Sequence, residues 1–330
     1  MSIKDAFILY ITVSRWEFLP AVLIGILIGI FIGADSINYL LSFNVILILL
    51  EGIIIFILLF NVGFMVNCWA DWKVDELYKT KLYHAVIEMG RNKLGLMVII
   101  HIIASILLAY HVTLQTNRIE ISMLVWIGIF LGVGYSIEPF RFKRRGLLHS
   151  LIALPIFFIP GFYSFLLVNS APLTDPYTLV FILAAIGITI GHYALILVSQ
   201  AEDTPADRKM GLLTPAVKWG VQKTLKISFL SNLIGSIIVT ISLIILFVYV
   251  NYFLLFLAPI IIIGRYFSMK EVYLLHKESS SFQSEEDLLI KLREKMMVYP
   301  LWHAYGLSGI TISSLSILIV KTMGWNINVF

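Results

Sequence analysis

Charged side chains are scarce in this chain of 330 residues. Asp, Glu, Lys and Arg make up 13% of it, whereas 59% of the residues are hydrophobic. An ordinary soluble domain is about 25% charged, so the composition excludes that class. Several apolar stretches reach the roughly 18 residues that a membrane-crossing helix needs. The sequence therefore predicts an all-α polytopic membrane protein.

Cysteine is almost absent, since Cys68 is the only one. This excludes a disulfide within the chain and a metal centre built on cysteines. The histidines of the apolar regions show no ligand spacing, so a soft or redox metal is not favoured; they are His101, His111, His192 and His303. The net charge of +4 comes with no nucleic-acid signature, so we expect no nucleic-acid partner.

Apolar runs predict nine membrane helices. They cover residues of about 16–34, 44–66, 94–113, 121–138, 147–168, 177–199, 226–249, 251–267 and 300–320. We expect them to form a single domain over 1–330, with spans one to four and five to eight as a possible pseudo-repeat. A polar stretch with an apolar stripe, about 282–298, predicts a surface helix on the cytosolic side.

The distribution of positive charge predicts the orientation. Of the 24 Lys and Arg residues, only Arg118 and Lys321 fall in segments that a cytosolic N-terminus would place outside. Such asymmetry indicates an N-in, C-out topology by the positive-inside rule. An Ile- and Lys-rich composition is typical of an AT-rich prokaryotic genome, so we expect an integral protein of a prokaryotic cell membrane. The segments expected to be cytosolic are 1–15, 67–93, 139–146, 200–225 and 268–299.

A polar motif, Asn67, Asp71 and Asp75, follows the second apolar run with a spacing of four. Residues four apart share one face of a helix, so an amide and two carboxylates would project together. Carboxylates near a membrane are costly unless they are paired or bind a cation. A solvated polar helix end is the alternative interpretation.

A second acidic pair, Asp203 and Asp207, repeats that spacing four spans later and on the same expected side. Thr204 and Pro205 predict an N-cap and a first helical position, so a helix restarts here. A helix N-terminus favours phosphate. Arg208 and Lys209 could also contact phosphate, or could serve only as cytosolic anchors; they follow directly in the sequence.

A third cytosolic stretch contains Tyr135, Arg141 and Lys143. Its basic residues could be topology signals, yet they lie on the side of both acidic motifs and could bind phosphate directly. Arg15, beside Trp16 at the start of the first span, is either an interfacial anchor or another phosphate contact.

Two facing carboxylate clusters are a common way to hold Mg²⁺ on a diphosphate, because Mg²⁺ shares its shell between carboxylates and phosphate oxygens. Asn67 would add a neutral oxygen ligand. A cation-coupled transporter is the physical competitor, but it does not call for two four-spaced motifs at cytosolic helix ends. A scaffold without catalysis is a third possibility, disfavoured by the retained acids.

The combined pattern resembles the UbiA-type intramembrane prenyltransferases. Asn67-x3-Asp71-x3-Asp75 is similar to their first motif, and Asp203-x3-Asp207 to their second. The stretch from Tyr135 to Lys143 resembles their linking motif, and Arg15 occupies the place of a first-helix arginine. The resemblance covers nearly the whole chain.

The resemblance implies a bundle of nine transmembrane helices around a central cavity that opens to the cytosolic side and to lipid. It implies that Asp71, Asp75, Asp203 and Asp207 are catalytic and, with Asn67, bind Mg²⁺. Arg15, Asn67, Tyr135, Arg141, Lys143, Arg208 and Lys209 are the expected diphosphate contacts.

The implied reaction transfers a prenyl group, for example from geranylgeranyl diphosphate, to a lipophilic acceptor by carbocation-type alkylation. No obligate protein partner is expected. The sequence departs from the family after the first motif, where Lys79 to Val86 replaces the usual Asn and Arg-Pro pair, and at Gln200, where many members carry an acid or Asn. The acceptor therefore stays open between a quinone precursor, a glycerol lipid, a carotenoid and another isoprenoid.

Overall fold

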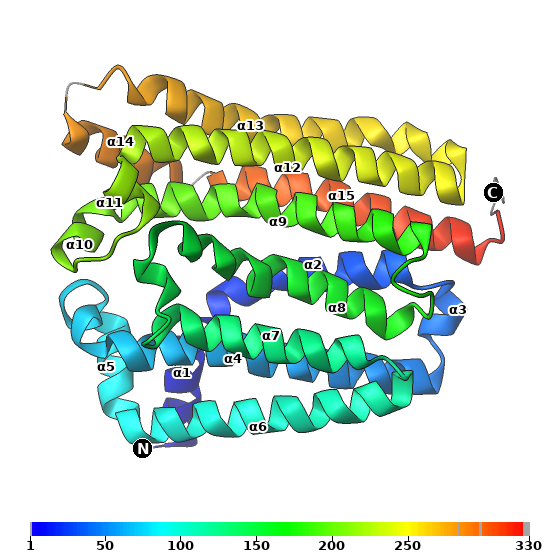
Figure 1. Ribbon diagram of the computed structural model, residues 1–330, viewed down its shortest axis with the longest axis horizontal. Coiled ribbons are helices and arrows are strands. Elements are labelled where there is room, and N and C mark those ends of the chain that lie inside the picture. The colour runs from blue at the N-terminus through cyan, green and yellow to red at the C-terminus, as the bar shows by residue number, and fades with distance from the viewer. Residues whose placement is uncertain (1, 283, 297–298, 326–330) are drawn as a thin grey trace.

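Long helices that run side by side dominate the computed structural model, which describes residues 2–282, 284–296 and 299–325 (Figure 1). Seven helical segments in this part of the chain are long and apolar enough to cross a membrane. Two shorter apolar helices, Val22–Gly33 and Gly306–Thr322, fall in the first and ninth expected spans. The all-helical membrane fold is confirmed, and nine crossings remain a prediction.

The middle of the bundle is formed by α2 (Leu19–Gly33) and α8 (Ile159–Val168). They approach closely because both carry glycine: a Cβ on Gly29 would collide with the Gly161 carbonyl and with Ser164. The hydroxyl of Ser164 donates to the Ile26 carbonyl at 3.0 Å across this contact. Short side chains and an inter-helix hydrogen bond are how membrane helices pack tightly.

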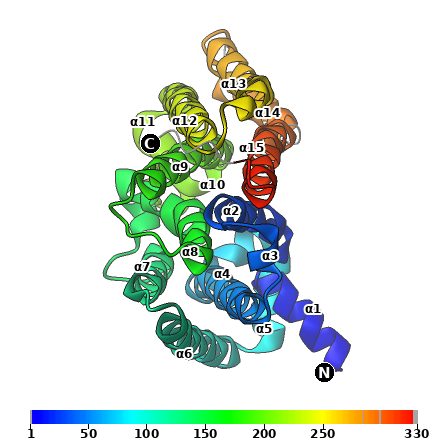
Figure 2. The same ribbon diagram turned by 90° about the vertical axis from the view of Figure 1, so that its right-hand side faces the viewer.

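Two groups of helices flank this centre, as Figure 2 shows in a view along the bundle. One group consists of α4 (Phe43–Tyr78), α6 (Arg91–Thr116) and α7 (Ile119–Ser136). The other consists of α9 (Pro176–Glu202), α12 (Val221–Val250), α13 (Ala258–Ser279) and α15 (Tyr299–Thr322). One apolar core joins the two groups through α2 and α8.

Short helices gather at one end of the bundle, on the left in Figure 1. They are α5 (Thr80–Met89), α10 (Thr204–Lys209), α11 (Pro215–Trp219) and α14 (Glu285–Met296). Helix α14 lies in the range 282–298 expected for a surface helix, of which 283, 297 and 298 fall outside the described residues. Its Leu288 and Leu292 are buried in the core of that end. At the opposite end lies α3 (Ile37–Leu40), near the end of α15.

Several elements differ from the sequence-based expectation. Residues 1–15 were expected only as a cytosolic segment, but Ile3–Val13 forms a helix, α1, capped by Ser2, and η1 (Trp16–Phe18) precedes α2. The second span continues without a break to Tyr78, and the eighth extends through η5 (Tyr252–Leu257) and α13 to Ser279. The buried Arg265 therefore lies inside α13 rather than at a helix end.

The expected fifth span, 147–168, is not one regular helix. It is preceded by η2 (Phe142–Arg144) and consists of η3 (Gly146–Ile152), the π-helix η4 (Leu154–Phe158) and α8. Pro155 and Pro160 lack backbone N–H donors, so regular i to i−4 bonding is interrupted here. Such irregular segments occur often at functional sites.

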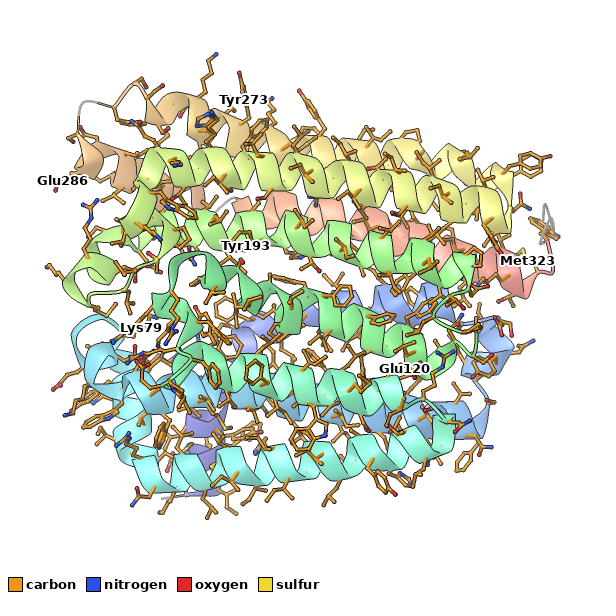
Figure 3. All side chains as sticks on the ribbon, in the orientation of Figure 1. Lys79, Glu120, Tyr193, Tyr273, Glu286 and Met323 are labelled. Carbon is orange, nitrogen blue, oxygen red and sulfur yellow. The ribbon has the colours of Figure 1, made fainter. Side chains whose placement is uncertain are left out.

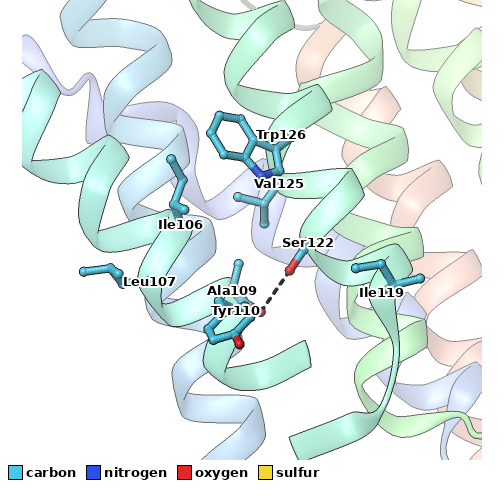
Figure 4. A pocket seen from close by; sticks show the side chains of 8 residues that line it. All are labelled: Ile106, Leu107, Ala109, Tyr110, Ile119, Ser122, Val125 and Trp126. Carbon is cyan, nitrogen blue, oxygen red and sulfur yellow. Dashed lines mark hydrogen bonds between the residues drawn. The ribbon is translucent and has the colours of Figure 1, made fainter. Parts of the chain in front are cut away.

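A cavity of about 340 Å³ opens between α6 and α7 (Figure 4). Its lining is mostly apolar, and the exposed Leu107, Tyr110 and Trp126 belong to it. The hydroxyl of Ser122 donates to the Ala109 carbonyl at its floor, at 3.3 Å. The acidic motifs lie on α4 and at the junction of α9 and α10, and no residue of either motif lines this cavity, so it is not part of the candidate site.

Candidate active site

The first acidic motif lies on the last turns of α4. This helix has 36 residues, which is about 54 Å at 1.5 Å per residue, far longer than a hydrocarbon core of about 30 Å. The Asn67 amide donates to Asp71 Oδ2 and to Ser136 Oγ, each at 3.1 Å. Asp75 is 4% exposed, and its buried Oδ2 has no hydrogen-bond partner among the described residues. An orphaned buried carboxylate oxygen calls for a ligand.

Two cations from the connection after α7 reach the same carboxylate. Arg141 Nη2 lies 3.1 Å from Asp71 Oδ1, and Lys143 Nζ donates to Asp71 Oδ2. Arg141 adopts a left-handed backbone, φ 34°, which is costly for a residue with a side chain. Burial lowers the pKa of Lys143, and the negative charge of Asp71 opposes that shift.

The second acidic motif lies where α9 gives way to α10. Asp203 ends α9, and the buried Asp207 accepts a hydrogen bond from Thr214 Oγ1 at 3.0 Å. The expected N-cap is shifted by one: Thr204 is the first helical residue of α10, and its hydroxyl returns to the Ala201 carbonyl at 2.8 Å. The loop after α10 is tied to η3, because Gly146 N–H donates to the Leu213 carbonyl at 3.0 Å.

Tyr135, near the end of α7, lies within reach of the charges of both acidic motifs. The negative charges of Asp207, Asp71 and Asp203 all act on its hydroxyl group. That hydroxyl is 2.9 Å from Nε2 of His149 on η3. Side chains from α4, α7, η3 and the α9–α10 junction thus surround one region at the end of the bundle.

A model of the UbiA prenyltransferase family matches residues 22–284. The chain belongs to this family. Membership confirms the predicted enzyme class, a prenyltransferase, and disfavours the transporter alternative. No curated protein sequence matches the chain.

Solved structures of UbiA proteins share the fold at low sequence identity. A digeranylgeranylglyceryl phosphate synthase is 15% identical with a TM-score of 0.68, and the match covers 95% of this chain and 100% of that one. A UbiA homologue from Archaeoglobus fulgidus bound to GPP and Mg²⁺ is 18% identical with a TM-score of 0.62, covering 92% and 99%. The same homologue bound to DMAPP and Mg²⁺ gives 18% and 0.61, with the same coverage.

The electrostatics of this UbiA protein distinguish the acids. Burial raises the pKa of Asp75 to about 6, while the positive charge of Lys79 opposes that shift. Burial likewise raises the pKa of Asp207 to about 6, and the hydrogen bond from Thr214 opposes it. Both carboxyl groups are therefore destabilised as free anions, so a bound cation would stabilise them strongly.

Lys79 is a functional candidate that sequence reasoning missed. It caps the end of α4, and its positive charge acts on both Asp75 and Asp207. Figure 3 shows it between the two halves of the bundle, near the loop of α10. The only signal in the sequence was its place four residues after Asp75, in the stretch where the chain departs from the family pattern.

The other expected phosphate contacts are Arg15, Arg208 and Lys209. The Arg15 guanidinium lies 4.5 Å from the Phe18 ring centroid and 3.2 Å from Glu17 Oε1, while its charge still acts on Asp75. Arg208 and Lys209 are exposed on α10, directly after Asp207.

The donor set fits Mg²⁺ that arrives with a phosphate ligand. Within the described residues, no three His, Cys, Asp or Glu side chains converge as a closed metal site. Mg²⁺ does not need such a cage, because it typically uses one or two carboxylates together with water and substrate phosphates. Asp71 and Asp75 on α4, and Asp203 and Asp207 around α10, each offer such a pair of oxygen ligands.

Proposed function

We propose that this protein catalyses Mg²⁺-dependent transfer of a prenyl group from a polyprenyl diphosphate, such as geranylgeranyl diphosphate, to a lipophilic acceptor within the membrane. Diphosphate is the second product. The observation that carries the proposal is the position of Tyr135, whose hydroxyl is in the field of Asp71, Asp203 and Asp207 at once. Carboxylates from two helix ends that share one space suit a ligand with several negative charges and bound metal.

Each acidic motif has a proposed ligand. Asn67, Asp71 and Asp75 would hold one Mg²⁺ against the diphosphate, and Asp203 and Asp207 a second. Bound Mg²⁺ supplies charge neutralisation for the departing diphosphate. A ligand made of a prenyl diphosphate and Mg²⁺ agrees with the A. fulgidus homologue, which binds GPP or DMAPP together with Mg²⁺.

The basic residues have a separate role. Lys143 and Arg141 form ion pairs with the Asp71 carboxylate in this structure. We propose that both cations turn to the phosphate oxygens when the metal binds that carboxylate. The two cations would thus exchange the carboxylate for phosphate, and no buried charge would be left unpaired. Lys79, Arg15, Arg208 and Lys209 would surround the remaining phosphate oxygens.

Exclusion of water would protect the prenyl cation. The segments that follow α4 and α9 carry the short helices α5, α10 and α11 and border the site. Their closure would remove water from the reacting carbon. The prenyl tail would extend away from the acids into the apolar bundle. Aromatic rings stabilise cations, and the chain has 22 Phe and 15 Tyr residues.

The proposal includes a membrane arrangement. Nine helices would surround a cavity open to the cytosol and to lipid, in one domain over 1–330. The N-terminus and the active site would face the cytosol of a prokaryotic cell, with the C-terminus outside. The termini of the structure lie toward opposite ends of the bundle, which supports this topology (Figure 1).

Purified protein in liposomes, incubated with Mg²⁺ and geranylgeranyl diphosphate, tests the function. Phenolic, quinone-precursor, glycerol-ether and isoprenoid acceptors would be supplied in turn, and prenylated products measured by mass spectrometry. We expect one acceptor class to be prenylated, with loss of product on chelation of Mg²⁺. Cation-driven solute uptake by the same liposomes, without product from any acceptor, would contradict the proposal.

A further inference from the structure

A chain of three polar side chains lies beside the proposed diphosphate site and is not explained by diphosphate binding. Tyr135 OH is 2.9 Å from His149 Nε2, and Gln200 Nε2 is 2.6 Å from His149 Nδ1 and 2.5 Å from His149 Nε2. The three residues come from α7, η3 and α9. His149 and Gln200 are 4% and 6% exposed, so the chain leads from the site into the protein.

The orientation of the Gln200 amide sets the direction of this chain. Among the described residues Gln200 Oε1 has no hydrogen-bond partner, while the amide nitrogen faces His149. Turning the amide by 180° brings Oε1 to the ring, where it accepts from Nδ1–H. The neutral imidazole then carries its proton on Nδ1, so Nε2 is an acceptor and Tyr135 O–H donates to it. In this arrangement each contact among Tyr135, His149 and Gln200 pairs one donor with one acceptor.

The outer end of the chain faces the reacting groups. Tyr135 oxygen keeps free lone pairs once its proton is donated to His149, and the charges of Asp71, Asp203 and Asp207 reach it. Tyr193 on α9 also interacts electrostatically with Tyr135, and in the part of the chain that the structure describes nothing forms a hydrogen bond with its buried hydroxyl. Figure 3 shows Tyr193 between α9 and the segment leading to α8. A buried orphan hydroxyl next to Tyr135 points to a polar ligand group at this place.

We propose that Tyr135, His149 and Gln200 form a relay that removes the proton of the prenyl acceptor. This inference rests on the proposed function and adds to it a proton route and a place for the acceptor's polar group, between Tyr135 and Tyr193. The carboxylates of the two acidic motifs are committed to metal in that function, so a separate base is needed.

The C–O bond of the prenyl diphosphate breaks and diphosphate leaves with the electron pair. A lone pair or π pair of the acceptor forms the new bond to the prenyl carbon, and the adduct becomes positively charged and strongly acidic. Its proton passes to Tyr135 oxygen while the proton of Tyr135 passes to His149 Nε2. The resulting imidazolium keeps its Nδ1–H on Gln200 and returns its proton to water or diphosphate as the products leave.

The surroundings of His149 suit a transient charge. Tyr135 faces it from α7, Gln200 from α9, and Lys143 acts on it from η2. Lys218 of α11 packs near Gly146 at the start of the same segment. In the hydrogen-bonded chain the ring of His149 is a neutral imidazole whose Nε2 can accept a proton during turnover.

The test uses His149→Gln in the full-length protein with geranylgeranyl diphosphate, Mg²⁺ and the acceptor that the wild type prenylates best. Glutamine can keep a hydrogen bond to Tyr135 but cannot take a proton. A general base contributes about 10²- to 10⁴-fold, so we expect kcat to fall by at least about 100-fold. Because the diphosphate contacts remain, the KM for geranylgeranyl diphosphate should change less than about twofold. Imidazole should restore part of kcat to His149→Ala.

A matched control exists in the same molecule. His101 Nε2 is 2.9 Å from Tyr10 OH, a second buried histidine–tyrosine pair that lies on α6 and α1. His101→Gln should leave kcat unchanged. A kcat of His149→Gln within threefold of wild type, or a fall that His101→Gln reproduces, would overturn the relay. Absence of Mg²⁺-dependent binding of geranylgeranyl diphosphate to the wild type would instead contradict the proposed function itself.

Discussion

Lys143 Nζ donates a hydrogen bond to Asp71 Oδ2, although 72 positions separate the two residues in the chain. The pair joins the end of α4 to η2, and its side chains are only 7% and 11% exposed. Mutual neutralisation keeps both charges tolerable at a buried position. Each member of the pair can also take a new partner. A metal ion can replace Lys143 as the partner of Asp71, and a phosphate can replace Asp71 as the partner of Lys143.

The cation of this pair should matter most for donor binding. Lys143→Met removes a charge-assisted hydrogen bond, which is worth about 1.5–3 kcal/mol, so we expect KM for the prenyl diphosphate to rise about 10- to 100-fold. Lys226→Met, an exposed lysine on α12, is the control. Steady-state kinetics measure both. Equal KM values for the two variants would contradict a phosphate role for Lys143.

Magnesium should stabilise the protein more at neutral than at acidic pH. Burial raises the pKa of Asp75 and of Asp207 to about 6, above the value of about 3.9 for an unfolded chain. The stabilisation from their protonation is complete below about pH 4 and is lost as pH rises through about 6. Mg²⁺ binds the ionised forms, so it should add stability mainly above about pH 6.

Thermal unfolding at about pH 5 and about pH 7.5, with and without Mg²⁺, measures this linkage. We expect a larger Mg²⁺-induced rise in Tm at the higher pH. Asp75→Asn with Asp207→Asn should abolish that difference. Glu286→Gln, an exposed acid on α14, should preserve it. A rise that is the same at both pH values would show that these carboxylates do not bind the metal.

Lys79 should tune both acidic motifs at once. Its charge lowers the pKa of Asp75 and of Asp207, so Lys79→Met should move the acidic limb of the pH–rate profile to higher pH. Lys79 is exposed to solvent, which weakens its interactions. We therefore expect KM for the donor to rise only about two- to fivefold. Lys81→Met, two residues along on α5, should leave the profile unshifted. The prediction fails if both variants behave alike.

The glycines where α9 and α12 cross should not tolerate substitution by a larger residue. A Cβ on Gly235 would lie 2.6 Å from the Gly187 carbonyl, so Gly235→Ala should destabilise the fold by about 1–3 kcal/mol. A Cβ on Gly63 of α4 would meet nothing within 4 Å, so Gly63→Ala should be neutral or stabilise by up to about 1 kcal/mol. Denaturant unfolding in detergent compares the two, and a reversed order would contradict the packing.

Most of the membrane architecture could be predicted from the sequence because long apolar runs have one structural solution in lipid. The four-residue spacing predicted a shared face for Asn67, Asp71 and Asp75, and the positive charges indicated their side. The irregular fifth span could not be predicted, since its hydrophobicity is the same whether or not Pro155 and Pro160 interrupt the helix.

Sequence patterns were weaker where function depends on contacts between distant segments. Lys79 was recognised only as a departure from a pattern, although its charge reaches both acidic motifs. His149 and Gln200 are 51 positions apart and carried no local spacing signal. Helix α1 was missed because a surface helix is recognised by a polar face. Phe7 and Ile8 are exposed although they are apolar, so the sequence shows no such face.

The most direct measurement of the central claim is a structure of the protein with Mn²⁺ and a non-reactive thio analogue of geranylgeranyl diphosphate. Anomalous scattering would locate the metal. We predict one Mn²⁺ on Asp71 or Asp75 and one on Asp203 or Asp207, each at about 2.1 Å and both on the same diphosphate. Metal on one motif alone, or a diphosphate bound away from Tyr135, would contradict the two-sided site.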